Sequence, residues 1–278
     1  MVIYPCCKIN LGLNIVEKRP DGYHNLETVF YPIPLYDTLD VSVMDDDNAC
    51  EERCTITTTG DAVECNPADN LVVKAYNIIA KDYDLPRVRI QLNKVIPSQA
   101  GLGGGSSDAA NMIKLLNAMF NLGMDASAME QYALRLGADC PFFINSEPTY
   151  ASGLGEIFEP LYSPDILKDM WIVLVKPSIA ISTREAFAGI KPQRSSVNCR
   201  EAVRRPISEW KDLLTNDFEN TLFPLHKELS DIKAALYENG AAYAQMSGSG
   251  STIFGIFEAE PDNMDAIFRD CRVFTIKL

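Results

Sequence analysis

The sequence predicts an α+β protein whose two lobes meet near residue 155. Along the chain, stretches with apolar residues at every second position alternate with stretches whose apolar residues have helical spacing. This alternation is typical of a mixed architecture. A length of 278 residues favours one or two packed lobes. From about Pro160 the character of the sequence changes. We therefore expect one domain over residues 1–155 and a second over residues 156–278.

The charge balance restricts the class of partner. Lysine and arginine number 25 against 38 acidic residues, so the formal net charge is −13. This excess argues against a nucleic-acid backbone or an anionic membrane as the main partner. We expect a cytoplasmic protein, because the N-terminus lacks a secretory pattern and the longest apolar run, Met170–Val175, is too short for a bilayer. A monomer and a homodimer both remain open.

The cysteines and one acidic cluster have ordinary interpretations. The eight cysteines include no Cys-x-x-Cys pair and no neighbouring histidine that completes a tetrahedral set, so we expect thiols in or near the core. The acidic cluster lies at a predicted hairpin tip without the spacing of a calcium loop, and we expect a solvated turn there. Its members are Asp45, Asp46, Asp47, Glu51 and Glu52.

Strand patterns dominate the start of the chain. They cover Cys6–Val16, Leu26–Ile33, Leu39–Val43 and Cys54–Thr58. Asn66 and Pro67 form a helix cap with proline at the first helical position, and that helix runs through Leu71 to Ile79. One face of the first strand is polar, which taken alone indicates a solvated face. The residues on this face are Lys8, Asn10, Gly12 and Asn14.

Helix and strand patterns also alternate in the rest of the chain. The predicted helices are 109–120, 127–136, a short one capped by Ser182 and Thr183, 211–223, 225–238 and 262–270. The predicted strands are 88–92, 170–175, 241–246, 252–257 and 272–277. Residues 191–209 are polar and irregular.

A glycine-rich stretch between a strand pattern and a helix pattern carries the clearest functional signal. Four glycines lie within five positions, so the backbone can turn its N–H groups inward and approach a ligand closely. The serines that follow lie at the positive end of the helix dipole. This combination indicates an anion site, and a polyphosphate is the favoured anion. The candidates are Pro97, Ser98, Gln99, Ala100, Gly101, Leu102, Gly103, Gly104, Gly105, Ser106 and Ser107.

Two common nucleotide-binding patterns do not fit this stretch. The Walker pattern requires a lysine before its serine, and no lysine precedes Ser106. The dinucleotide fingerprint requires Gly-x-Gly-x-x-Gly early in a βαβ unit, and residues 101–106 lack that form.

Asp139 and His24 are titratable residues whose roles the local sequence alone does not decide. Asp139 stands among small and apolar residues before a proline. It is either a turn residue or a partly buried functional group, which would have to be paired. His24 follows a Pro-Asp-Gly turn, where a lone histidine is more often a surface side chain than a ligand.

Several stretches resemble the motifs of one enzyme superfamily. Pro97–Ala110 is similar to the second motif of the GHMP kinases, and Met246–Phe254 to their third motif. Lys8–Leu13, Arg19–Thr28 and Gly137–Phe143 resemble one family within it, the 4-diphosphocytidyl-2-C-methyl-D-erythritol kinases. The likeness runs from residue 8 to about residue 257, without 191–209. Residues 98–100 depart from it, because Ser-Gln-Ala stands where relatives often carry Met-Gly-Gly or Met-Gly-Ala.

The resemblance implies a fold and a reaction. The fold is a ribosomal-protein-S5-like N-terminal lobe and a ferredoxin-like C-terminal lobe, with ATP and a small-molecule substrate between them. The reaction transfers the γ-phosphoryl group of ATP to the 2-hydroxyl of the methylerythritol unit, in the non-mevalonate route to isoprenoids. Lys8 and Asp139 are the expected catalytic pair, in which Asp139 takes the proton and Lys8 orients the hydroxyl. Mg²⁺ is expected with ATP, and Ser107 is its candidate ligand.

The resemblance also implies further contacts with both substrates. Residues 97–107 are expected to hold the ATP phosphates, and Asn70 and Leu71 to lie near the adenine. Tyr23 and Phe187 are expected to sandwich the cytosine, and His24 to bond its edge. Asn10 is expected to contact the substrate beside Lys8. The polar face of the first strand then becomes a wall of the site.

Two other functions compete with this one. A GHMP kinase for another small alcohol, such as homoserine or mevalonate, is disfavoured because those relatives lack the Asp-Gly-Tyr-His segment at 21–24. A non-catalytic nucleotide-binding module predicts the loss of Lys8 or Asp139, and both are present.

Overall fold

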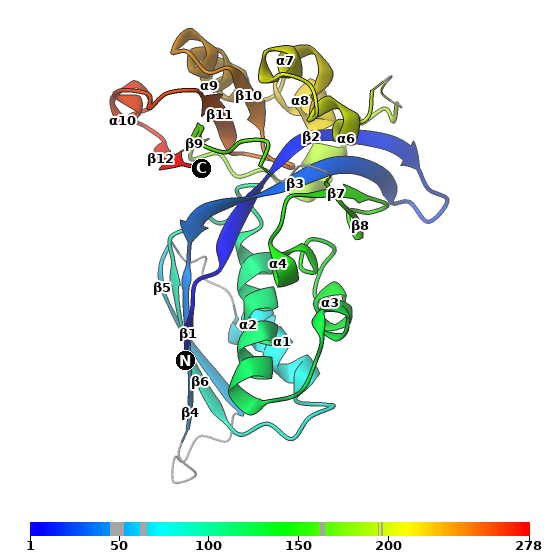
Figure 1. The fold of residues 1–278 in the computed structure, drawn as a ribbon, viewed down its shortest axis with the longest axis vertical. Coiled ribbons are helices and arrows are strands. Elements are labelled where there is room, and N and C mark those ends of the chain that lie inside the picture. Colours follow the sequence, from blue (N-terminus) through cyan, green and yellow to red (C-terminus); the bar gives the residue numbers. More distant parts are fainter. Residues whose placement is uncertain (45–52, 62–65, 162–164, 194, 196) are drawn as a thin grey trace. The chain divides into compact units, whose positions relative to one another are not determined.

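The computed structural model describes residues 1–44, 53–61, 66–161, 165–193, 195 and 197–278 (Figure 1). By its contacts the chain divides into two compact units that are interleaved along the sequence. The first unit contains residues 1–7, 35–98 and 103–146, and the second contains 8–34, 99–102 and 147–278. The domain boundary at residue 155 stays a prediction. The acidic cluster at 45–52 lies outside the described residues.

The first unit is built on a four-stranded sheet with helices on one side of it (Figure 1). The strand order is β1 (Val2–Ile3), β4 (Thr38–Val43), β6 (Val88–Lys94) and β5 (Cys54–Gly60). The pair β5–β6 is parallel and the other pairs are antiparallel. The helices are α1 (Leu71–Ile79), α2 (Gly104–Phe120), α3 (Ala126–Leu134) and α4 (Phe142–Asn145). This unit carries the second half of the glycine-rich stretch at the start of α2.

The second unit contains two four-stranded sheets. One has the order β2 (Cys6–Lys18), β3 (His24–Tyr36), β7 (Thr149–Ser152) and β8 (Ile157–Pro160), and the first residues of β2 and the last of β3 belong to the first unit. The other is antiparallel, in the order β10 (Tyr243–Met246), β11 (Ile253–Phe257), β9 (Trp171–Lys176) and β12 (Arg272–Lys277). With helices after β9 and after β11, this is the predicted ferredoxin-like arrangement.

The helices of the second unit cover much of its chain. They are α5 (Thr183–Phe187), α6 (Cys199–Ala202), α7 (Trp210–Leu213), α8 (Asp217–Leu222), α9 (Lys227–Glu238) and α10 (Met264–Ile267). Helix α9 packs on β10 and β11, and its buried Leu229, Ile232 and Leu236 join the core that β9 and β11 supply. None of the described helices is long and apolar enough to cross a membrane.

Three predicted elements need correction. Asn66 caps only a 3₁₀ turn, Pro67–Asp69, and Asn70 then caps α1 through Val72 N–H. The predicted helix 211–223 is interrupted at 214–216, because the Thr215 carbonyl accepts a hydrogen bond from Leu13 N–H of β2. Residues 191–209 are not wholly irregular, since α6 and the 3₁₀ turn Ile207–Glu209 lie there. The six described cysteines are thiols, as expected.

A buried charge cluster stabilises the first unit beneath the start of α2. Strand β6 alternates buried and exposed positions, and this alternation places Lys94 on the buried face. The Lys94 ammonium bonds Asp37 and, at 2.6 Å, Asp108. Asp37 also accepts the N–H groups of Val95 and Ile96. Because one ammonium serves two carboxylates, burial and the charge of Asp37 raise the pKa of Asp108 to about 7.

This cluster predicts a pH-dependent cost in stability. The folded-state pKa of Asp108 lies above its ordinary value of 3.8, so folding favours the protonated carboxyl. The contribution of this protonation to the free energy of unfolding is complete below about pH 4 and is lost as the pH rises through about 7. Asp108→Asn removes the titration. Between about pH 5 and pH 8, its free energy of unfolding should therefore rise relative to the unmodified protein by roughly 2 kcal/mol. Denaturant titrations at both pH values measure it.

The matched control for this experiment is Asp84→Asn, at an exposed aspartate of the same unit. Its free energy of unfolding should show no such change with pH relative to the unmodified protein. A difference between the Asp108→Asn variant and the unmodified protein that stays constant from pH 5 to pH 8 would contradict the account.

Candidate active site

The polar face of β2 is buried rather than solvated. Lys8 is 4% exposed and Asn10 is 2% exposed, and both residues belong to the second unit. The Lys8 ammonium donates to Asn10 Oδ1 at 2.7 Å and lies 4.7 Å from the centroid of the Phe30 ring. A buried ammonium requires such partners, because burial without them costs several kcal/mol. The structure thus brings together the two predicted residues of this strand.

Thr28 fixes the orientation of the Asn10 amide. Asn10 Nδ2 donates to Thr28 Oγ1 at 3.0 Å, and the same hydroxyl donates to the Gly12 carbonyl. Since Nδ2 is engaged by Thr28, Asn10 Oδ1 is left to face Lys8. Thr28 is fully buried. It therefore holds the amide that in turn holds the lysine.

The first half of the glycine-rich stretch, residues 99–102, belongs to the same unit as Lys8. Lys8 N–H donates to the Leu102 carbonyl at 3.0 Å. The Ser247 hydroxyl donates to the Gly101 carbonyl at 2.8 Å and accepts Asn10 N–H at 3.3 Å. The second and third predicted motifs therefore meet each other and β2 at the hydroxyl of Ser247.

The backbone at residue 99 has a conformation that favours glycine. Gln99 has φ +51°, in the left-handed region that glycine adopts without a steric penalty. The resemblance places glycine at this position. Gln99 keeps the glycine-like backbone at a cost of roughly 1–2 kcal/mol.

The second half of the stretch, in the first unit, begins α2. Gly103, at φ +69°, is the residue before the helix, and no side chain caps it. A side chain at residue 104 would stand 2.9 Å from Ile96 Cγ2 and 3.3 Å from Lys94 Nζ, so only glycine lets the helix start lie against the charge cluster. Gly105 is exposed, and Leu71 lies near its Cα. The uncapped helix start offers backbone N–H groups to an anion.

The other predicted residues of the first unit lie around this helix start. Asp139 is a half-buried turn residue between α3 and α4, and its functional role stays a prediction. The next residue, Cys140, is hydrogen-bonded to Ser106 of α2, and burial and Asp139 raise the pKa of its thiol to about 11. Ser107 is fully buried and its hydroxyl accepts Asn111 Nδ2 at 3.3 Å. Asn70 and Asp139 thus belong to one unit with Gly103–Ser107.

The aromatic candidates lie in the second unit, and two of them form a stack. The rings of His24 and Phe187 are 5.1 Å apart at 26°. Phe218 supports Phe187 from the side, at 4.9 Å and 82°. Tyr23 is 64% exposed. The His24–Phe187 contact was not anticipated from the sequence.

Several residues that shape the site were missed in the sequence. Thr28 lies within a stretch that carries the resemblance but had no assigned role. The strand alternation of Val88, Ile90 and Leu92 would have placed Lys94 on the buried face. No sequence signal pairs Ser247 with Gly101, because their contact joins residues 146 positions apart.

Gly101→Ala tests whether the loop must lie against the Ser247 turn. A Cβ atom at residue 101 would stand 2.0 Å from the Ser247 carbonyl oxygen, and φ is +74°. We expect the free energy of unfolding to fall by roughly 2 kcal/mol, measured by denaturant titration. Gly105→Ala is the matched control. Its nearest contact is 3.8 Å and its stability should stay within about 0.5 kcal/mol. Equal stability of the two variants would contradict the account.

Comparison with known proteins identifies the family. The model of the GHMP kinases N terminal domain matches residues 70–147, and that of the GHMP kinases C terminal matches residues 199–271. A 4-diphosphocytidyl-2-C-methyl-D-erythritol kinase of Bacteroides thetaiotaomicron is 51% identical over 260 residues, which cover 94% of this chain and 93% of that protein. The enzyme of the same name from Parabacteroides distasonis is 47% identical, with 98% and 97% covered.

Solved structures agree with the sequence matches. A crystal structure of 4-(cytidine 5'-diphospho)-2C-methyl-D-erythritol kinase superposes with a TM-score of 0.83 at 28% identity, covering 99% of this chain and 98% of that chain. A mevalonate kinase, at 15% identity and a TM-score of 0.69, shares the fold, with 100% and 98% covered. The predicted α+β GHMP kinase fold is confirmed. The chain belongs to the GHMP kinases and, within them, to the 4-diphosphocytidyl-2-C-methyl-D-erythritol kinase family.

Proposed function

We propose that this protein transfers the γ-phosphoryl group of ATP to the 2-hydroxyl of 4-diphosphocytidyl-2-C-methyl-D-erythritol. The observation that carries the proposal is the buried Lys8–Asn10 pair, which is joined through Ser247 to the glycine-rich loop. The names of the close relatives support this acceptor over homoserine or mevalonate. The mevalonate kinase, at 15% identity, supports the fold alone.

Lys8 and Asp139 are the proposed catalytic pair. Asp139 takes the proton of the attacking hydroxyl, and Lys8 orients that hydroxyl and stabilises the charge that develops on it. The Asn10 amide keeps the Lys8 ammonium in place. A positioned ammonium lowers the cost of the transition state, because it does not have to reorganise during the reaction.

ATP is the co-substrate of the GHMP kinases, and we propose that residues 97–107 hold its phosphates. Left-handed glycines in the loop and the uncapped start of α2, whose first backbone N–H groups lack helical acceptors, support this role. Asn70 and Leu71 are the proposed adenine neighbours. Leu71 supports this role, because it lies beside Gly105 at the loop.

We propose that Mg²⁺ accompanies ATP and neutralises phosphate charge. Within the described ranges, no group of three or more His, Cys, Asp or Glu side chains is placed to hold a metal ion. That fits an ion bound mostly by phosphate oxygens and water. Ser107 is the proposed protein ligand. Because its hydroxyl already accepts Asn111 Nδ2, it supplies at most one oxygen.

The aromatic residues of the second unit are the proposed cytosine site. His24 and Phe187 present adjoining rings, and Phe218 keeps Phe187 in place. Tyr23 offers an exposed ring for the other face of the base. His24 is the proposed hydrogen-bonding residue. We place the reaction in the cytoplasm, a compartment that suits the thiol state of the described cysteines.

Asp139→Asn and Lys8→Ala test the catalytic pair. Loss of the proton acceptor or of the ammonium should lower kcat by roughly 10²–10⁴-fold. ADP release with Mg-ATP and the cytidylyl acceptor measures it. Asp84→Asn and Lys168→Ala, at exposed positions, are the controls and should keep kcat within about twofold. If Asp139→Asn or Lys8→Ala has the same kcat as the controls, the role assigned to that residue is refuted.

Tyr23→Ala tests the cytosine contact. Stacking of a base on an aromatic ring contributes roughly 1–3 kcal/mol, so KM for the cytidylyl acceptor should rise by roughly 5- to 150-fold. KM for ATP should not change. Tyr4→Ala is the control, since Tyr4 is 63% exposed, as Tyr23 is 64%. An acceptor KM that is unchanged in Tyr23→Ala would count against the sandwich.

A further inference from the structure

A second cavity lies in the second unit, apart from every residue assigned to catalysis or substrate binding. Its volume is about 450 Å³, within the range of small-molecule sites. Apolar side chains that include Val203, Ile207 and Trp210 form much of its wall. Three arginines, Arg200, Arg204 and Arg205, also line it. The cavity therefore combines an apolar surface with guanidinium groups.

The positive charge is notable in a chain with a net charge of −13. Arg200 pairs with Glu159 at 2.6 Å, and Arg204 pairs with Glu201 at 3.5 Å. Across the described ranges, Arg205 forms no ion pair, and it is exposed. A guanidinium presents several N–H donors in a planar fork that matches carboxylate and phosphate oxygens. Arg205 is thus the arginine with donors available to an anionic ligand.

The wall of the cavity is held rigidly. Trp210, which begins α7, is 1% exposed and packs edge-on against Tyr243 at 5.6 Å. Its indole N–H donates to the Arg205 carbonyl at 2.9 Å. This bond fixes the backbone that carries the Arg205 side chain. A preformed cavity of this kind loses little conformational entropy when a ligand binds.

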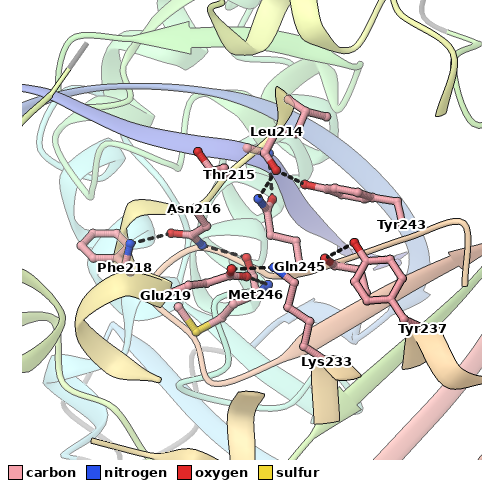
Figure 2. A network of polar contacts seen from close by, with 12 residues as sticks. Leu214, Thr215, Asn216, Phe218, Glu219, Lys233, Tyr237, Tyr243, Gln245 and Met246 are labelled. Carbon is pink, nitrogen blue, oxygen red and sulfur yellow. Dashed lines mark hydrogen bonds and ion pairs between the residues drawn. The ribbon is translucent and has the colours of Figure 1, made fainter. Parts of the chain in front are cut away.

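A continuous chain of hydrogen bonds joins this wall to β2, and Figure 2 shows its middle part, in which Tyr243 and Gln245 bond Leu214. Leu214 N–H donates to the Trp210 carbonyl at 2.8 Å. The Leu214 carbonyl accepts the Tyr243 hydroxyl at 3.0 Å and Gln245 Nε2 at 3.2 Å. Gln245 Oε1 then accepts Gly12 N–H at 2.8 Å. Gly12 stands two residues from Asn10, on the strand that carries Lys8.

We propose that this cavity is a second ligand site, for a small amphipathic anion with an apolar body and a phosphate or carboxylate head. The apolar wall takes the body, and Arg205 takes the head. A ligand that contacts Trp210 is linked to Gly12 through the hydrogen bonds of Leu214 and Gln245, so occupancy alters the kinase. The binding step goes beyond the proposed function and does not depend on it.

Isothermal titration calorimetry tests the binding step. Geranyl diphosphate and decanoate share the required chemistry, and pyrophosphate and geraniol each carry half of it. At least one complete amphiphile should bind roughly tenfold or more tightly than either half-molecule. The tighter of the two amphiphiles identifies the source, a prenyl phosphate or a fatty carboxylate. Failure of both to bind would overturn the proposal.

Two variants and a control test whether the amphiphile binds in this cavity. Arg205→Glu reverses the charge of the head site, and Ile207→Ser removes apolar wall. Each should weaken binding of the complete amphiphile by roughly tenfold or more. Arg89→Glu, at an exposed arginine of the first unit, should bind as the unmodified protein does. Circular dichroism verifies that each variant is folded. Binding that is equal in Arg205→Glu, Ile207→Ser and Arg89→Glu would overturn the site.

Kinetics test the coupling to β2 separately. At a saturating concentration of the amphiphile, kcat or the acceptor KM of the unmodified protein should change at least twofold. Arg205→Glu should show no change at that concentration. If calorimetry shows binding while kcat and KM stay constant in the unmodified protein, the coupling step is wrong. Absence of kinase activity altogether would refute the proposed function and leave the calorimetric result standing.

Discussion

One buried hydroxyl joins β2, the strand that carries Lys8, to two other segments of the second unit. Ser247 Oγ accepts Asn10 N–H and donates to the Gly101 carbonyl, so three segments far apart in the sequence converge on one oxygen. A buried polar group left without its partner costs roughly 1–3 kcal/mol, so the segments stabilise one another's positions. The Lys8 ammonium depends on the same junction, because Asn10 is its hydrogen-bond acceptor.

In the first unit, buried ion pairs rather than a hydroxyl hold the glycine-rich stretch in position. Its loop residues begin α2 beside the Lys94 ammonium, which Asp37 and Asp108 neutralise. A rigid, buried cluster at this point keeps the helix start in one position. A phosphate group needs a positioned set of N–H donors, because the net charge of −13 repels anions elsewhere. In the proposed function, the local geometry of the loop therefore has to attract a phosphate group that the overall charge of the chain repels.

Local patterns predicted most of the fold. Alternation of apolar residues predicted β2 and β6, a continuous apolar run predicted β9, and the capping residue Ser182 predicted α5. The helix predicted at 211–223 was wrong at 214–216, because the Leu13 bond to Thr215 is a tertiary contact that local propensity does not contain. The burial of Lys8 and Asn10 is likewise tertiary. The alternation of polar residues in β2 by itself indicates a solvated face, and only the resemblance indicated a site wall.

The site was predicted mainly by motif, and its supporting contacts were not. The resemblance supplied Lys8, Asp139 and the loop, each recognisable by residue type and spacing. The Ser247–Gly101 bond and the His24–Phe187 stack join residues more than 140 positions apart, so no local pattern contains them. The backbone of Gln99 explains why relatives carry glycine there, which the sequence of this chain alone does not reveal.

The most direct test of this account is the choice of acceptor. The measurement is ADP release with Mg-ATP, compared for 4-diphosphocytidyl-2-C-methyl-D-erythritol, mevalonate, homoserine and galactose at equal concentration. The account predicts turnover of the cytidylyl acceptor alone, because Tyr23, His24 and Phe187 are the residues assigned to its base. Comparable kcat/KM on one of the other alcohols would contradict the assigned acceptor.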